Sequence, residues 1–198
     1  MGTGRIPYRS QDHEGRARSG FKLLEWCKYG ANIFTSRLTS IQGIHYGTPQ
    51  ANSLQLVKHY FDTYPEDANR VVLSIKGAFG MKTGPTGSPD AIRASVEDAV
   101  NVLGNSKKID IFEMARVDPN VPVELSVKAL AELVKEGKIG GIGLSEVGAS
   151  TIRKAHAIHP IAAVEIELSL FTPDPLKNGI VDTCHEREYC LRQWNVIC

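Results

Sequence analysis

Four polar residues stand where strand-like segments end, and their types could support binding or acid–base chemistry. Lys76 follows the apolar run "VVLSI", and Arg116 follows "IDIFEMA". Ser145 ends the run "IGGIGLS", and Glu167 lies near the end of "IAAVEIEL". Side chains from the carboxyl ends of parallel strands meet at one site in β/α proteins. These four residues are therefore candidates for a shared functional site.

Each candidate also has an ordinary interpretation. A lysine at a strand end is commonly solvated, and Ser145 could cap the helix that follows it. Glu165 and Glu167 lie two residues apart and so share one face of a strand, where two carboxylates could work as an acid–base pair. Tyr46, in "HYGTP", would on its own be a packing or surface residue.

The segments that would position these residues alternate between helix-like and strand-like patterns. Ser88 as a capping residue and Pro89 at the first helical position predict where one helix begins, and Gly104 predicts its end. Strands are predicted at residues 70–76, 109–114, 139–145 and 161–168. Helices are predicted at residues 21–27, 53–60, 89–103, 121–136 and 148–156.

This order, with strands of nearly continuous apolar character, predicts a parallel sheet covered by helices. Repeats of about 30 to 35 residues suit either a doubly wound sheet or a (β/α)8 barrel. No GxGxxG or GxxxxGK[ST] motif is present, so the usual nucleotide-binding loops are absent. The polar strand ends favour the barrel.

Composition narrows the possible functions. The net charge of +1 over 198 residues gives no reason to expect a nucleic acid or an acidic membrane as a partner. No apolar run approaches the ~20 residues that span a bilayer, and the first residues lack the apolar core of a signal peptide. The 4 cysteines have no metal-ligand spacing, so we expect no metal site. A cytoplasmic protein with reduced thiols is the expectation.

Five stretches in the same order carry a family resemblance. The sequence resembles the aldo-keto reductases, most nearly the fungal pyridoxal reductase branch, from about residue 20 to residue 186. The resemblance implies an α/β fold, a partial (β/α)8 TIM barrel with roughly strands two to six and their helices. It also implies NADPH as cofactor and a small aldehyde as substrate. The stretches are "YGTPQANSLQLVKHYF", "VVLSIKGAFG", "KIDIFEMARVDPNVPVE", "LAELVKEGKIGGIGLSE" and "IAAVEIELSLFTPD".

The resemblance assigns roles to particular residues. Tyr46 matches the tyrosine that protonates the carbonyl oxygen, and Lys76 matches the lysine beside it. A tyrosine ordinarily has a pKa near 10 and needs nearby positive charge to act as an acid at neutral pH. Ser145 and Glu165 match positions that bind the carboxamide of the nicotinamide. Tyr46 and Lys76 are therefore the predicted catalytic residues, and Ser145 and Glu165 the predicted cofactor-binding residues.

Two further residues and two departures complete the comparison with the family pattern. Arg116 and Asp118 are predicted to bind substrate, or alternatively to form a salt bridge with each other. Ala115 stands where most aldo-keto reductases have histidine, a difference that the pyridoxal reductase branch shares. Ile41 stands where the family has an aspartate or asparagine, and an apolar side chain cannot pair with Lys76.

Other segments depart from the family pattern. Residues 1–19 are expected to be an atypical, disordered segment, residues 20–186 a partial barrel, and residues 187–198 a tail foreign to the family. Residues 35–44 and both termini are interpreted as products of a retained intron. The loops that would contact the cofactor pyrophosphate and 2′-phosphate follow strands seven and eight, which this sequence lacks.

Three functions remain open. The leading hypothesis is an NADPH-dependent carbonyl reductase that resembles pyridoxal reductase, with activity weakened by the absent loops. The alternative is an inactive fragment that acts through protein contacts, with self-association through exposed barrel edges. A third is a different barrel enzyme that uses Glu165 and Glu167.

Overall fold

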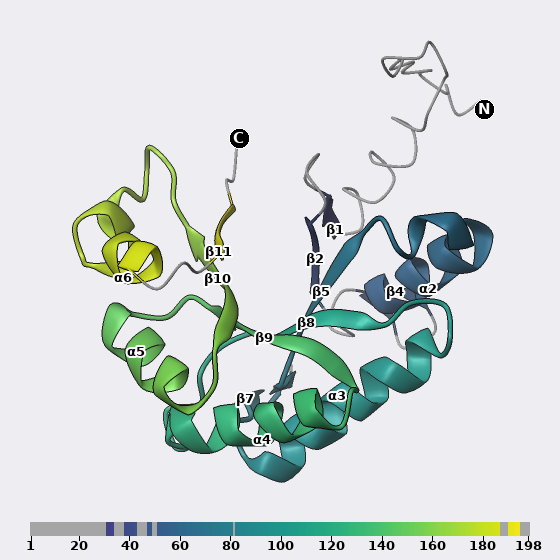
Figure 1. Ribbon diagram of the computed structural model, residues 1–198, viewed down its shortest axis with the longest axis horizontal. Helices are drawn as coiled ribbons and strands as arrows, with labels where there is room; N and C mark the ends of the chain where they lie inside the picture. Colours follow the sequence, from purple (N-terminus) through teal and green to yellow (C-terminus); the bar gives the residue numbers. More distant parts are fainter. Residues whose placement is uncertain are drawn as a thin grey trace.

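A curved, mostly parallel sheet forms the centre of the protein, and helices cover its outer side (Figure 1). The computed structural model describes residues 31–33, 38–42, 47–48, 51–80, 82–186 and 190–194. Its seven-stranded sheet has the order β1-β2-β5-β8-β9-β10-β11. The strands are β1 (Ala31–Ile33), β2 (Leu38–Gln42), β5 (Val72–Gly77), β8 (Ile109–Met114), β9 (Ile139–Ser145), β10 (Ile161–Glu167) and β11 (Cys190–Trp194).

All neighbouring strands from β2 to β11 pair in parallel, whereas β1 is antiparallel to β2. Figure 1 shows the helices in an arc around the strands. This is part of a (β/α)8 barrel and confirms the predicted fold class. The helices are α2 (Ser53–Thr63), α3 (Pro89–Leu103), α4 (Val123–Lys135), α5 (Ala149–Ile158) and α6 (Ile180–Glu186). Short hairpins join β3 (Gly47–Thr48) to β4 (Ala51–Asn52) and β6 (Phe79–Gly80) to β7 (Gly84–Pro85), and two short 3-10 helices lie at Pro65–Asp67 and Asp174–Leu176.

The core lies between the sheet and its helices. Leu73 and Ile75 of β5 are buried in this apolar layer. Because side chains alternate along a strand, Ser74 and Lys76 lie on the opposite face, which is the interior of the curved sheet. Strands β8, β9 and β10 repeat the pattern, with Phe112, Leu144, Val164 and other apolar residues in the core. The apolar layer thus fixes which side chains enter the barrel interior.

Local signals set the helix boundaries. The Ser88 hydroxyl accepts the backbone N–H of Ala91 at 3.3 Å, Pro89 begins α3, and Gly104 ends it with φ of 56°. This confirms the predicted cap and bounds of that helix. In the main sheet, the pattern did not predict β2 and β11, and the short hairpin strands β3, β4, β6 and β7 were not predicted either. The predicted helix at residues 21–27 and the predicted disorder of residues 1–19 lie outside the described residues.

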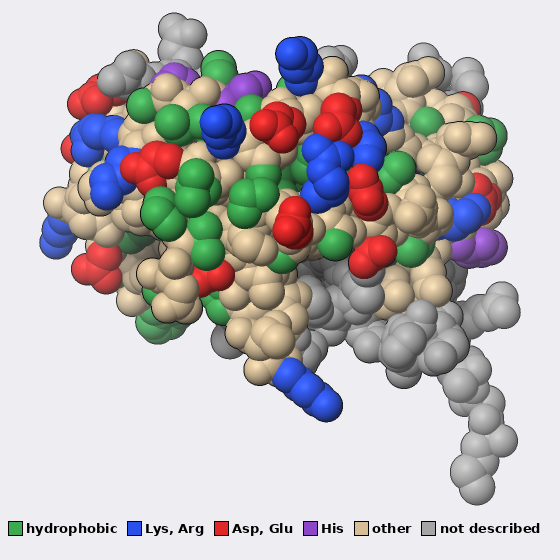
Figure 2. All heavy atoms as spheres, turned by 90° about the horizontal axis from the view of Figure 1, so that it is seen from below, with side chains coloured by type: hydrophobic (Ala, Val, Ile, Leu, Met, Phe, Trp, Pro, Cys, Tyr) green, Lys and Arg blue, Asp and Glu red, His purple; other side chains and the backbone are tan. Residues whose placement is uncertain are grey.

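Acidic and basic side chains are interspersed on the helix-covered face shown in Figure 2. The Arg93 guanidinium donates two hydrogen bonds, of 2.9 and 2.6 Å, to the Glu136 carboxylate. The same arginine and Lys138 contact Glu97. The hydrogen bonds from Arg93 lower the pKa of Glu136 to about 2. Exposed pairs of this kind add little stability. Among the described residues, no helix is both long and apolar enough to cross a bilayer.

Candidate functional site

Lys76 lies inside the protein, at the carboxyl end of β5. It is 3% exposed, so the interpretation of a solvated lysine is wrong. The next residue, Gly77, lies against the ring of Phe112: a Cβ there would be 2.5 Å from Cζ of that ring and 2.6 Å from the Ser95 hydroxyl. Core packing on one side of β5 therefore fixes the backbone that carries Lys76.

The ammonium of Lys76 forms an ion pair with Oε1 of Glu165 on β10. Glu165 is 8% exposed. Strands β8 and β9 lie between β5 and β10 in the sheet, so the ion pair crosses the curved interior. Because an isolated charge is strongly disfavoured away from water, the two opposite charges compensate each other in this interior.

Ser145 ends β9 directly beside this ion pair. It is 1% exposed, and Glu165 is its partner in the strand register. A guanidinium nitrogen of the exposed Arg116 lies 3.5 Å from the Ser145 hydroxyl and also donates to the carbonyl of Ala115 at 2.6 Å. The alternative that Ser145 caps a helix is wrong, because Gly148 is the N-cap of α5. The structure thus brings Lys76, Ser145 and Glu165 together, with Arg116 at their rim.

A second buried carboxylate belongs to the same interior. Glu113 of β8 is the register partner of Lys76, is fully buried, and accepts a hydrogen bond from the Ser74 hydroxyl. A Cβ on Gly143 would lie 2.3 Å from Cγ of Glu113, so the glutamate side chain occupies the space above that glycine. Sequence reasoning missed Glu113. Its signal was an acidic residue within the largely apolar run "IDIFEM".

Two strands leave this region through left-handed backbone. Ala78, two residues after Lys76, has φ of 56°, and Glu146, directly after Ser145, has φ of 54°. Residues other than glycine rarely adopt this conformation, which costs about 1–3 kcal/mol. Hydrogen bonds hold both residues: the Ala78 N–H donates to Ser95 Oγ at 2.9 Å, and the Glu146 N–H donates to the Glu165 carbonyl at 2.9 Å. Strain of this kind concentrates at functional sites.

Asp118 holds a loop together. Its carboxylate accepts the backbone N–H groups of Gly87 at 2.9 Å and Asn120 at 2.8 Å. These hydrogen bonds, first that of Gly87, lower the pKa of Asp118. Both Asp118 and Arg116 lie in the described part of the chain, and they form no ion pair with each other there. Substrate binding by these two residues stays a prediction.

The two glutamates of β10 have separate tasks. Glu165 is paired with Lys76, whereas the Glu167 carboxylate accepts the Thr172 hydroxyl at 2.8 Å within the turn that follows the strand. The Glu167 N–H donates to the Glu146 carboxylate at 2.8 Å. These contacts give no support to an acid–base pair of the glycosidase type.

Tyr46 lies outside the described residues, so its catalytic role stays a prediction. The strands on either side of it in the sequence are described. Gln42, four residues earlier, ends β2 and is the register partner of Lys76, and Ile41 is the register partner of Ile75. Strand β2, which ends four residues before Tyr46 in the sequence, thus lies next to the strand that carries the lysine.

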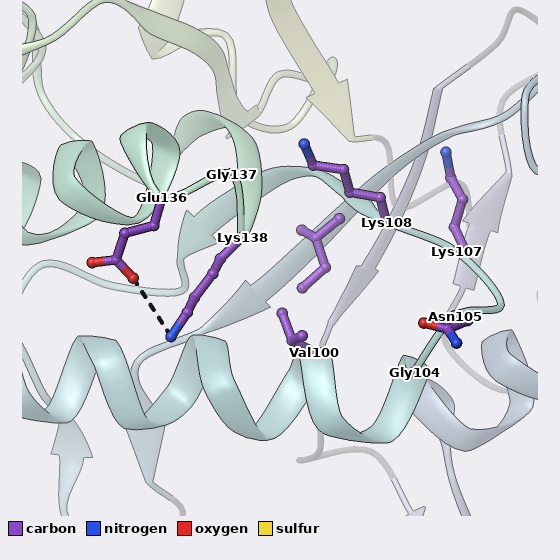
Figure 3. A pocket seen from close by; sticks show the side chains of 9 residues that line it. Val100, Gly104, Asn105, Lys107, Lys108, Glu136, Gly137 and Lys138 are labelled. Atoms are coloured by element: carbon purple, nitrogen blue, oxygen red, sulfur yellow. Dashed lines mark ion pairs between the residues drawn. The ribbon is translucent and has the colours of Figure 1, made fainter.

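A different hollow lies at the opposite ends of the strands (Figure 3). It measures about 430 Å³ and lies between the last turn of α3, the loop before β8 and the loop after α4. Lys138 reaches toward Glu136 there, with 3.5 Å between the charged atoms, and Lys107 pairs with Asp110 at 2.7 Å. In barrels of this type the active site lies at the carboxyl ends of the strands, whereas residues at the amino ends contribute to stability.

A nicotinamide cofactor would need hydrogen-bonding groups for its carboxamide. Ser145 can donate to a carbonyl oxygen, and the Glu165 carboxylate can accept from an amide nitrogen, so the two residue types suit that group. In the described part of the chain, no group of three or more His, Cys, Asp or Glu side chains could hold a metal ion.

Comparison with known proteins places these features in a family. The model of the aldo/keto reductase family matches residues 29–195. A Schizosaccharomyces pombe protein named "Probable pyridoxal reductase 2" is 43% identical over 187 residues, which are 93% of this chain and 54% of the relative. The chain thus spans about half the length of that relative.

Solved structures have the same fold at lower identity. A glycerol dehydrogenase of Gluconobacter oxydans matches with a TM-score of 0.68 and 21% identity, over 79% of this chain and 48% of the other. A thermostable aldo-keto reductase matches with a TM-score of 0.64 and 18% identity, over 77% of this chain and 52% of the other. The family match, the relative and the barrel agree: the chain belongs to the aldo/keto reductase family.

Proposed function

We propose that this chain is an NADPH-dependent carbonyl reductase that reduces an aldehyde such as pyridoxal to the alcohol. The observation that carries the proposal is the meeting of Lys76, Ser145 and Glu165, all buried, at the carboxyl ends of three strands. Family membership and the pyridoxal reductase named above support the reaction class and the substrate. We place the reaction in the cytoplasm.

The proposed chemistry needs a proton donor beside a fixed positive charge. We assign the proton to the phenol of Tyr46, which passes it to the carbonyl oxygen. The Lys76 ammonium stabilises the phenolate that remains, because opposite charges within a few ångströms favour the ionised form. Burial strengthens this interaction, since water does not screen it. When bound, the reduced nicotinamide supplies the hydride that reduces the carbonyl carbon.

The remaining residues bind and orient. We assign Ser145 to the carboxamide of the nicotinamide, which its buried hydroxyl would hold at the strand end. Arg116 lies at the exposed rim of the same site, 3.5 Å from that hydroxyl, where it could attract a phosphate or an acidic substrate group. Asp118 supports the neighbouring loop through Gly87 and Asn120.

A second candidate function rests on the two edge strands of the described sheet. β1 and β11 are the terminal strands of the described sheet, and each has one hydrogen-bonded neighbour there. A strand with one free side can pair with another chain. Under this proposal the chain associates with a second copy, or with another protein, and does not turn over substrate. Light scattering across a concentration series, with turnover measured on the same samples, separates this candidate from the reductase.

The reductase proposal is tested by cofactor binding and product formation with the full chain. NADPH is titrated while protein fluorescence is followed, and pyridoxal is then added while loss of NADPH and formation of the alcohol are measured. The proposal predicts saturable binding and equal amounts of NADPH consumed and alcohol formed. Tyr46→Phe should bind NADPH and form no alcohol. Absence of NADPH binding, or equal turnover by Tyr46→Phe, would contradict the proposal.

A further inference from the structure

The ion pair between Lys76 and Glu165 suggests a role for the glutamate that differs from cofactor binding. The strand beside β5 offers Ile41 and Gln42 next to the lysine in register, and neither is an acid. The carboxylate that reaches the ammonium comes instead from β10, 89 residues along the chain.

Other charged and polar residues are neighbours of the ion pair in the strand register. Glu113, the register partner of Lys76 on β8, accepts from Ser74. Ser145 lies beside Glu165 on β9, and Arg192 is the register partner of Glu165 on β11. Among the described residues, Glu165 is the acid whose carboxylate forms an ion pair with the buried ammonium of Lys76.

A buried lysine without a compensating charge tends to lose its proton, and a neutral amine cannot stabilise a phenolate. We propose that Glu165 is a positioning residue of the reductase reaction, which keeps Lys76 charged and holds its ammonium at the carboxyl end of β5. This inference rests on the proposed function for its catalytic consequence. The ion pair itself can be tested without turnover.

Glu165→Gln separates this role from cofactor binding. Glutamine keeps the size of the side chain and can hydrogen-bond a carboxamide, but it has no charge. If Glu165 positions Lys76, the variant should bind NADPH with a Kd within about twofold of the wild-type value and lose about tenfold or more in kcat. If Glu165 serves only the cofactor, kcat should stay unchanged, because glutamine can still hydrogen-bond the carboxamide.

Chemical labelling of lysines gives a measurement that does not depend on activity. An amine-acylating reagent reacts with neutral amines, and mass spectrometry reports the rate at each lysine. Glu165→Gln should raise the rate at Lys76 several-fold and leave Lys107 unchanged. The matched control is Asp110→Asn, because Lys107 is also buried and pairs with Asp110 at 2.7 Å. That variant should raise the rate at Lys107 alone.

The outcomes are distinguishable. Faster labelling of Lys76 with an inactive wild-type protein would support the ion pair and overturn the proposed function. Unchanged labelling of Lys76 in Glu165→Gln, or unchanged kcat in an active enzyme, would overturn the positioning role. If Glu165→Gln does not fold, Glu165→Asp takes its place. That variant keeps the charge on a shorter side chain, so it should retain labelling close to wild type and partial kcat, and labelling as fast as that of a surface lysine would contradict the role.

Discussion

Lys76 and Glu165 form a buried ion pair that joins β5 to β10 across the interior of the curved sheet. The two residues are 89 positions apart in the chain. Their side chains share the face of the sheet that points away from the helices, as do Ser145 and Glu113. The barrel interior near the strand ends is therefore polar, while the layer beneath the helices is apolar.

Breaking this ion pair should cost stability, and removing both charges should restore it. Lys76→Met leaves the Glu165 carboxylate buried without its partner, so the free energy of unfolding should fall by about 3–5 kcal/mol. The double variant Lys76→Met/Glu165→Leu should recover most of that loss. Urea denaturation measures the change. Lys58→Met removes a half-exposed pair with Asp62 and should cost less than about 1 kcal/mol. Equal effects of the two single variants would contradict a buried ion pair.

Ser145→Ala should weaken NADPH binding and leave the fold intact. The net value of one neutral hydrogen bond is about 1 kcal/mol, so Kd should rise about fivefold. The matched control is Ser126→Ala, because Ser126 is equally buried but lies on α4 and donates at 2.7 Å to the carbonyl of Gly87. That variant should lower the melting temperature without changing Kd. An unchanged Kd in Ser145→Ala would remove Ser145 from the cofactor site.

Asp118 should make stability depend on pH in the acid range. The N–H groups of Gly87 and Asn120 lower its pKa below 3.8, so its contribution is complete above that value. It is lost as pH falls through the lower pKa of the folded state. Asp118→Asn should thus lower the melting temperature at neutral pH, with a smaller difference near pH 3. Asp98→Asn, which alters another acid on the surface, is the control. A constant difference at all pH values would show that the charge of Asp118 does not matter.

A side chain at position 143 should destabilise the folded protein. A methyl group there would overlap Cγ of Glu113, so Gly143→Ala should reduce the free energy of unfolding by about 1–3 kcal/mol. Gly141→Ala is a graded comparison, because its nearest side-chain neighbour, Cβ of Ala162, is 3.1 Å away. Thermal unfolding compares the two variants. A Gly143→Ala protein as stable as Gly141→Ala would mean that Glu113 can move aside.

Local sequence signals predicted much of the fold. Strands β8 and β9 match the predicted bounds because each is a largely apolar run, and α3 matches because Ser88, Pro89 and Gly104 mark its ends. Strand β2 was missed because its residues do not alternate, and pairing with β5 sets it. Strand β11 was also missed, and its parallel pairing with β10 sets it.

The site could be predicted only in part. The position of Lys76 after an apolar strand indicated its place, and family motifs indicated Ser145 and Glu165. No local pattern could show that Lys76 and Glu165 pair, because their contact depends on the curvature of the whole sheet. The left-handed backbone at Ala78 and Glu146 was equally hidden, since neither residue type favours it.

The central claim is that the buried ammonium of Lys76 serves chemistry at the carboxyl ends of the strands. The most direct measurement compares NADPH-dependent reduction of pyridoxal by Lys76→Met and Lys107→Met, two variants that each remove a buried, ion-paired lysine from opposite ends of the barrel. The account predicts that Lys76→Met loses turnover while retaining NADPH binding, and that Lys107→Met keeps turnover. Full turnover by a folded Lys76→Met protein would contradict it.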